Sequence, residues 1–161
     1  MIEFAPDSGA PQPSLYTLSK LEEDLGILLP EEYVALIRRS NGGVPVRNVF
    51  RVGGQERLIE RFLCILDDPE SDERHGAYDV GVVWSQISER LLDDPDLVGT
   101  NVLPIAALFA GDMLCLDFRE DPAAPAVVVW DHEQSEEFRP HFTPVADSLT
   151  GFLQLLQTPE A

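Results

Sequence analysis

The sequence predicts a single α+β domain over residues 14–161, with a central antiparallel sheet flanked by helices. Three observations support this class. The length of 161 residues fits one domain. Apolar residues recur at helical spacing in two N-terminal segments, one middle segment and one C-terminal segment. Short β-rich runs bounded by Gly and Pro fill the remaining chain, and they follow one another in groups.

A flexible N-terminal arm, residues 1–13, is predicted to precede this domain, because Pro and Gly interrupt it and periodicity is weak. In the first helix, Ser14 can cap the start and Gly26 can end the last turn. A second helix begins near Pro30, which suits a first helical turn, and stops at the NGG segment, 41–43. The inner face of the first helix is predicted to consist of Leu15, Leu18, Leu21 and Leu25.

The middle of the chain changes from strands to a helix. Residues 44–66 are rich in β-branched and aromatic residues, and Gly53-Gly54 divides them into two strands. Residues 67–73 hold five acids in seven positions and read as an exposed loop. A third helix is then predicted, because apolar side chains follow the i, i+3, i+4, i+7 pattern at Val80, Val83, Trp84, Ile87 and Leu91.

The C-terminal third predicts strands and a closing helix. Residues 103–118 give two short strands broken at Ala110-Gly111, and the apolar run 126–130 pairs with the second of them as a hairpin. Along 112–118, alternate side chains point to opposite faces of the sheet. A helix around 146–157 ends the domain.

The charge balance is strongly acidic, with 29 Asp and Glu against 11 Lys and Arg, a net charge of −18. Two explanations stay open: a compositional bias of the lineage, and a basic protein partner. Under either explanation, the acidic charge disfavours nucleic acid and anionic membranes as partners, because phosphate binding needs clustered Lys and Arg. If several acidic loops share one face, they attract a cationic partner and speed its association. The candidate protein-binding residues are Asp67, Asp68, Glu70, Asp72, Glu73, Asp93, Asp94, Glu120, Asp121, Asp131, Glu133, Glu136 and Glu137.

No catalytic, cofactor-binding or metal-binding residue is predicted. Cys64 and Cys115 lie in apolar runs, without a C-x-x-C pair or a neighbouring histidine, and read as small buried side chains. In the segment 131–133, Asp-His-Glu, adjacent side chains diverge, so at most Asp131 and Glu133 are expected to converge on one ion. A metal-dependent enzyme remains one of the hypotheses, and its candidate residues are Asp117, Asp131, His132 and Glu133.

The predicted location is the cytoplasm. No apolar run approaches the roughly 18 residues of a membrane span. The start of the chain also lacks the basic and apolar stretches of a signal peptide.

Four segments, in order, resemble motifs of the SUKH superfamily, the Smi/Knr-type domains. The resemblance extends over about residues 15–157; it is looser over 44–100, and Leu149 stands where an aromatic residue is common. The four segments are LEEDLGILLPEEYVALIRRSNGG (21–43), LPIAALFAGDMLCLDFRED (103–121), VVVWDHE (127–133) and PVADSLTGFLQLL (144–156).

This resemblance implies a non-catalytic scaffold whose partner-contacting positions vary between members. The bacterial members of this superfamily include immunity proteins, which bind and neutralise polymorphic toxins, often nucleases. An immunity protein with a basic toxin domain as partner is therefore the leading hypothesis. The alternative is an intracellular regulatory or scaffold protein, like the fungal regulators of cell-wall synthesis in the same superfamily.

Overall fold

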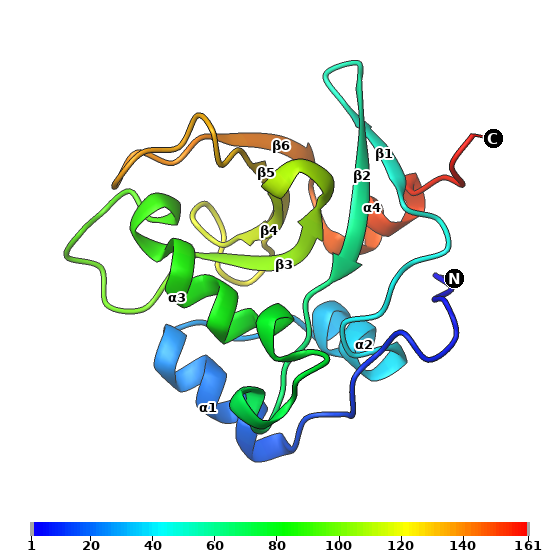
Figure 1. Ribbon diagram of the computed structural model, residues 1–161. Helices are drawn as coiled ribbons and strands as arrows, with labels where there is room; N and C mark the ends of the chain where they lie inside the picture. Colours follow the sequence, from blue (N-terminus) through cyan, green and yellow to red (C-terminus); the bar gives the residue numbers. More distant parts are fainter. Residues whose placement is uncertain (1, 161) are drawn as a thin grey trace.

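The structure is a computed structural model that describes residues 2–160, and it confirms the α+β class (Figure 1). Within these residues, four α-helices accompany one six-stranded sheet whose strands lie in chain order and pair antiparallel throughout. The helices are α1 (Leu15–Leu25), α2 (Glu31–Arg39), α3 (Val80–Leu91) and α4 (Leu149–Leu155). The strands are β1 (Val49–Val52), β2 (Gln55–Phe62), β3 (Val102–Leu108), β4 (Met113–Asp117), β5 (Ala126–Trp130) and β6 (Phe142–Ala146).

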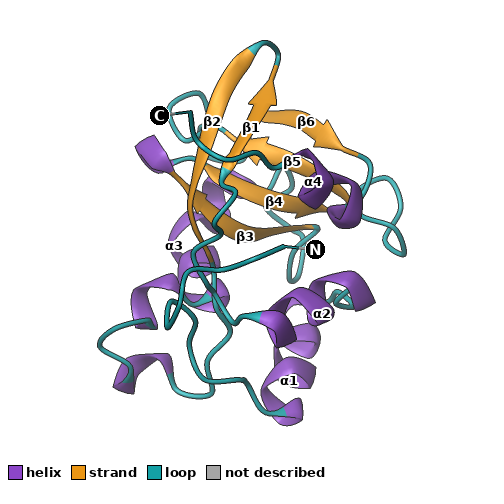
Figure 2. Cartoon of the chain, turned by 90° about the vertical axis from the view of Figure 1, so that its right-hand side faces the viewer, coloured by secondary structure: helices purple, strands orange, loops and turns teal. Residues whose placement is uncertain are grey.

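The sheet lies between helices, with α3 and α4 on different sides of it (Figure 2). Alternate side chains of β4 pack into two different hydrophobic clusters, one on each face of the sheet, as the sequence predicts. Leu114 and Leu116 belong to the larger core, which includes Phe152 of α4. Cys115 belongs to a smaller cluster with Trp130 of β5 and Leu91 of α3. Both faces of β4 are therefore buried.

Helix α1 has the predicted bounds, but one predicted core position is wrong. The Ser14 side chain accepts a hydrogen bond from the Thr17 backbone N–H, and Gly26 ends the helix with φ of 69°. Leu18 and Leu25 are buried, whereas Leu15 is 71% exposed. At about 100° per residue, Leu15 lies about 60° around the axis from Leu18 and farther from Leu25. It therefore points away from the core.

The NGG segment does more than follow α2, which already ends at Arg39. The Asn41 side chain donates to the Pro11 and Ile65 carbonyls, at 2.7 and 2.8 Å, and accepts from the Ile65 N–H at 2.8 Å. Gly42 has φ of 78°, and a Cβ there would lie 2.6 Å from Cβ of Cys64. The segment thus joins the N-terminal residues to the chain that follows β2.

Part of the expected N-terminal arm makes backbone contacts with the rest of the domain. Residues 3–10 run along the loop after α2, with hydrogen bonds from Ala5 N–H to the Val44 carbonyl and from Ala10 N–H to the Asn41 carbonyl, both 2.8 Å. Ser8 is buried among them. These contacts are between backbone groups distant in sequence, so Pro and Gly content did not reveal them.

The strands at 44–66 and 103–130 are confirmed, and one strand was not predicted. Gly53 and Gly54 form the β1–β2 turn, with φ of 57° and 80°. Strand β6, which pairs with β5, carries Pro144. Proline is tolerated at a sheet edge but weakens the sequence signal for a strand. The closing helix α4 is shorter than predicted because β6 occupies the residues before it.

Candidate functional site

The structure divides the predicted acidic residues into two groups. Those at 67–73 lie beside the start of α1, because Asp67 accepts a hydrogen bond from Ser14 N–H at 2.9 Å. The remaining ones lie on loops around the C-terminal end of α3, which we call the α3-end acidic surface. Its predicted members are Asp93, Asp94, Glu120, Asp121, Asp131, Glu133, Glu136 and Glu137.

Two arginines link the loops of the α3-end acidic surface to the end of α3. Arg119, which follows β4, lies 3.9 Å from the Asp93 carboxylate after α3. Arg90, in the last turn of α3, donates to the carbonyls of His132 and Ser135. The backbone of Phe138 also donates to the Glu89 carbonyl at 2.6 Å. Segments separated by up to 49 residues in sequence, as for Phe138 and Glu89, therefore meet at one end of the sheet.

Two acids of the 67–73 loop have a role in the fold. Hydrogen bonds from Thr17, followed by those from Ser14, lower the pKa of the Asp67 carboxyl at the start of α1. Asp72 accepts from the His75 N–H at 2.8 Å, which lowers the pKa of its carboxyl. The 67–73 loop lies at the start of α1. The other end of α1, where the Leu25 carbonyl accepts from Thr100 in the loop after α3, is about 15 Å away along this 11-residue helix.

Several carboxylates of the α3-end acidic surface bind turn backbone and still face solvent. Asp94, Asp121 and Asp131 accept N–H hydrogen bonds at 2.9–3.0 Å from residues two positions later. Glu120 and Glu137 are exposed and accept no hydrogen bond from the residues that the structure describes. The three aspartates therefore stabilise turns and also contribute negative surface charge. The two exposed glutamates can be changed without removing a hydrogen bond.

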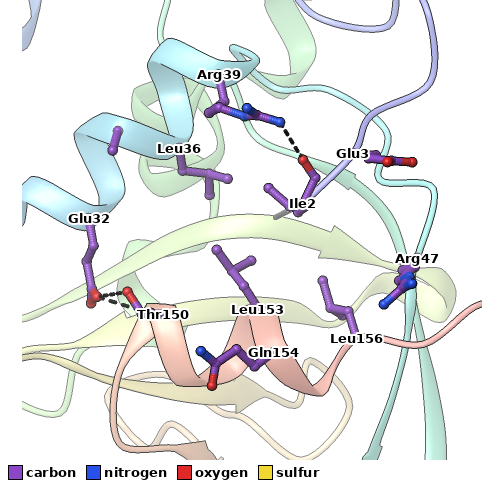
Figure 3. A pocket seen from close by; sticks show the side chains of 11 residues that line it. Ile2, Glu3, Glu32, Leu36, Arg39, Arg47, Thr150, Leu153, Gln154 and Leu156 are labelled. Atoms are coloured by element: carbon purple, nitrogen blue, oxygen red, sulfur yellow. Dashed lines mark hydrogen bonds between the residues drawn. The ribbon is translucent and has the colours of Figure 1, made fainter.

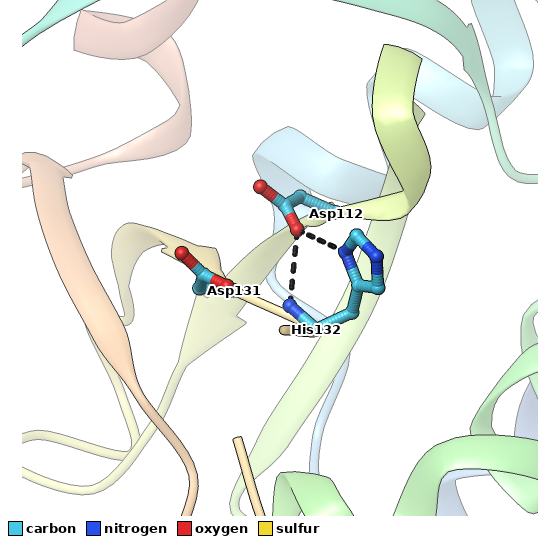
Figure 4. Close-up of side chains that lie close together, drawn as sticks. All are labelled: Asp112, Asp131 and His132. Carbon is cyan, nitrogen blue, oxygen red and sulfur yellow. Dashed lines mark hydrogen bonds and ion pairs between the residues drawn. The ribbon is translucent and has the colours of Figure 1, made fainter. Parts of the chain in front are cut away.

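Asp112 connects the ends of three strands in a cluster that the sequence did not predict (Figure 4). One carboxylate oxygen pairs with Arg57 of β2. The other accepts from the His132 backbone N–H at 3.0 Å and lies 2.6 Å from His132 Nδ1. Gly111 has φ of 95°, and a Cβ there would lie 3.1 Å from the His132 ring. The Gly-Asp turn and the Asp-His turn thus pack directly on each other.

The same cluster bears on the metal hypothesis. Potential ligand atoms of Asp112, Asp131 and His132 lie within 4.8 Å of one another. The expected partner of Asp131 was Glu133, but the chain turns after β5, so Asp131 groups with His132 and Asp112 instead. Both Asp112 oxygens are already engaged, and Arg57 places positive charge beside them. This arrangement favours a structural role over a cation site. We call the contacts of Asp112 with Arg57 and His132 the Asp112 clasp.

The clasp makes stability depend on pH. Burial favours the neutral form of Asp112, but hydrogen bonds from the His132 backbone and ring and from Arg57 outweigh it, so the pKa of this carboxyl is lowered. A lowered pKa means that the carboxylate stabilises the fold above its unfolded-state pKa of about 4, and that this contribution is lost as the pH falls through the folded pKa.

We therefore expect Asp112→Asn to lower the free energy of unfolding by about 2 kcal/mol at pH 7, because Arg57 loses its charged partner. The difference from wild type should shrink as the pH is lowered from about 5 to about 3. Urea denaturation at several pH values measures it. Glu120→Gln, at an exposed position, is the control and should follow wild type at each pH. A difference for Asp112→Asn that does not change with pH would contradict the assignment.

Both cysteines are free and buried, as the sequence predicts. Burial raises the pKa of the Cys64 thiol to about 12, and it raises the pKa of Cys115 further. Since the thiolate is the reactive form, neither thiol is suited to nucleophilic catalysis. We expect neither to react with a disulfide reagent in the native protein and both to react after denaturation. A fast native phase would contradict this prediction.

A groove of about 800 Å³ lies between α2, α4 and the N-terminal segment (Figure 3). Its charged side chains are of both signs. Arg39 donates to the Ile2 carbonyl at 2.7 Å. Glu32 accepts from Leu149 N–H and from the Thr150 hydroxyl, at 3.0 and 2.6 Å, and so secures the start of α4. This groove lacks the uniform charge that would select a cationic partner.

The comparisons with known proteins agree with the motif resemblance. The sequence profile described as SMI1-KNR4 cell-wall, of the SUKH group, matches residues 16–153. No curated protein and no solved structure gives a significant match. None of the helices that the structure describes is long and apolar enough to cross a membrane. Because the profile covers most of the chain and overlaps all four α-helices that the structure describes, the chain belongs to the SMI1-KNR4 family of the SUKH superfamily.

Proposed function

We propose that this protein is a cytoplasmic immunity protein that binds and neutralises a basic toxin domain, such as a nuclease. Membership of the SMI1-KNR4 family supports a non-catalytic role for the domain. The single observation that carries the proposed partner chemistry is the α3-end acidic surface, where separate loops place carboxylates together in a protein of net charge −18.

The physical reason is charge complementarity. A nuclease must bind phosphates, so its active face carries Lys and Arg. Carboxylates on a facing protein attract that face from a distance and accelerate association. An inhibitor seated there also blocks access of nucleic acid to the toxin. A stable complex of this kind buries on the order of 1,600 Å² in total.

Co-expression tests the proposal. Where a large toxin-type gene lies beside this one, the C-terminal domain that it encodes is expressed in cells with and without the protein. We expect survival only when the protein is present. Cell death that the protein does not prevent, with both proteins soluble, would contradict the proposed function.

A pair of charge reversals tests the location of binding. Glu120→Lys with Glu137→Lys changes the α3-end acidic surface at positions without hydrogen bonds. Glu70→Lys with Glu73→Lys makes the same change of charge on the 67–73 loop and serves as the matched control. We expect the first pair to reduce protection and the second to retain it, because only the first places cations opposite the basic partner. The reverse order would assign binding to the other end of α1.

A further inference from the structure

An apolar groove adjoins the α3-end acidic surface. It has a volume of about 540 Å³ and lies between the end of α1, the α1–α2 loop and the β4–β5 loop. Its apolar lining comes from Ile27, Leu28, Phe118, Pro122 and Ala123. This size falls within the range of sites that accept one or a few side chains or a small ligand.

Leu28, which lines this groove, and Val98, whose carbonyl oxygen would lie 3.7 Å from a Cβ at the lining residue Gly26, are both large exposed apolar residues. Leu28 is 76% exposed and Val98 is 92% exposed. They belong to different loops that meet at the end of α1, where Thr100 N–H donates to the Leu25 carbonyl at 2.8 Å. Gly99 permits this contact, since a Cβ there would lie 2.3 Å from the Leu25 carbonyl oxygen. Exposed apolar residues gathered at one place are typical of interaction sites.

The loops that carry these side chains are fixed before any partner binds. After Leu28, the Leu29 N–H donates to the Glu22 carboxylate at 2.7 Å, which ties the α1–α2 loop to α1. Before Val98, the Leu97 N–H donates to the Asp94 carbonyl at 3.2 Å. Because these segments are already ordered, binding there costs less conformational entropy than ordering free loops.

Carboxylates lie in the groove and next to it. Glu22 and Glu23 of α1 line it, and Glu120 and Asp121 directly precede its lining residue Pro122 in the β4–β5 loop. Arg119 lies directly after the lining residue Phe118, and Asp117 accepts two hydrogen bonds from its guanidinium, both at 2.9 Å. The positive charge of Arg119 is therefore largely compensated, and the groove stays in a negative environment.

We propose that this groove, with Leu28 and Val98, is the contact centre of the complex, and that it receives an apolar side chain flanked by Lys or Arg on the toxin domain. The inference rests on the proposed function and specifies its site. Protein interfaces commonly combine an apolar centre with a charged rim. The acidic rim selects a basic protein; it disfavours a second copy of this chain, whose net charge is also −18.

The test compares two double variants in a binding titration with the same toxin domain. Leu28→Ser with Val98→Ser removes the apolar pair. Leu15→Ser with Tyr16→Ser is the matched control, since Leu15 and Tyr16 are 71% and 74% exposed at the other end of α1. Both variants should keep the melting temperature of wild type, because exposed side chains contribute little to stability.

We expect the groove variant to bind about 30-fold or more weakly than wild type, the effect of losing contact-centre residues. The control variant should bind within about threefold of wild type. Equal affinity of the groove variant and wild type would overturn the inference and leave the proposed function standing. Wild-type protein that does not bind at all would overturn both.

Discussion

Replacing Phe152 with alanine is expected to lower the free energy of unfolding by about 4 kcal/mol, among the largest effects of any single substitution in this chain. Phe152 in α4 is fully buried. Its ring meets that of Phe50 in β1 edge to face, with 5.1 Å between ring centroids. The substitution leaves a cavity between the helix and the sheet that the surrounding core cannot fill. Urea or guanidinium denaturation at pH 7 measures the loss.

The matched control is Phe109→Ala. It removes the same atoms from a side chain that is 54% exposed, in the β3–β4 turn. We expect a loss below about 1 kcal/mol there, because little apolar surface leaves the protein interior. Similar losses at the two positions would contradict the placement of Phe152 in the core.

Replacing Asn41 with alanine is expected to cost about 3 kcal/mol. Asn41 is 1% exposed, and its side chain makes three hydrogen bonds, to the Pro11 carbonyl and to the N–H and carbonyl of Ile65. Alanine removes the partner of all three backbone groups, and the buried Ile65 N–H and carbonyl each cost about 1–3 kcal/mol before any relaxation. Denaturation of the variant measures the change.

Asn48→Ala serves as the comparison for Asn41. The Asn48 amide donates one longer hydrogen bond, 3.2 Å to the Ile59 carbonyl. We expect its removal to cost about 1 kcal/mol. If the Asn41 variant were no less stable than the Asn48 variant, the NGG segment would not hold the N-terminal residues and the chain after β2 together as described.

Elements with local signals were predictable from the sequence. Helix α1 begins after Ser14 and stops before Gly26, because capping and left-handed backbone are decided by neighbouring residues. The β1–β2 hairpin follows from Gly53-Gly54, and the burial of Trp130 follows from its apolar strand. In each case, residues within one turn of helix or one strand determine the outcome.

Features that depend on distant contacts were not predictable. Strand β6 is formed by pairing with β5, and Pro144 hides it in the sequence. The Asp112 clasp needs Arg57, which lies 55 residues away. Predicting it would require the sheet register, which places the β3–β4 turn beside the end of β5.

The candidate site was likewise only partly predictable from the sequence. The acidic residues were identifiable from composition, but their separation into two groups depends on which end of α1 each loop meets. Leu28 and Val98 carried no sequence signal for exposure, because apolar residues in a sequence usually predict burial. Their exposure follows from the turns at Gly26 and Gly99, which bring the two loops together outside the core.

We propose that this protein binds a basic toxin domain through charge and a small apolar centre. Calorimetric titration of the purified protein with the neighbouring toxin's C-terminal domain tests it most directly, at about 0.05 M and about 0.5 M salt. We predict saturable binding at the lower salt concentration and clearly weaker, still measurable binding at the higher one, because screening removes the charge contribution and leaves the apolar one. No binding at the lower salt concentration would contradict the account.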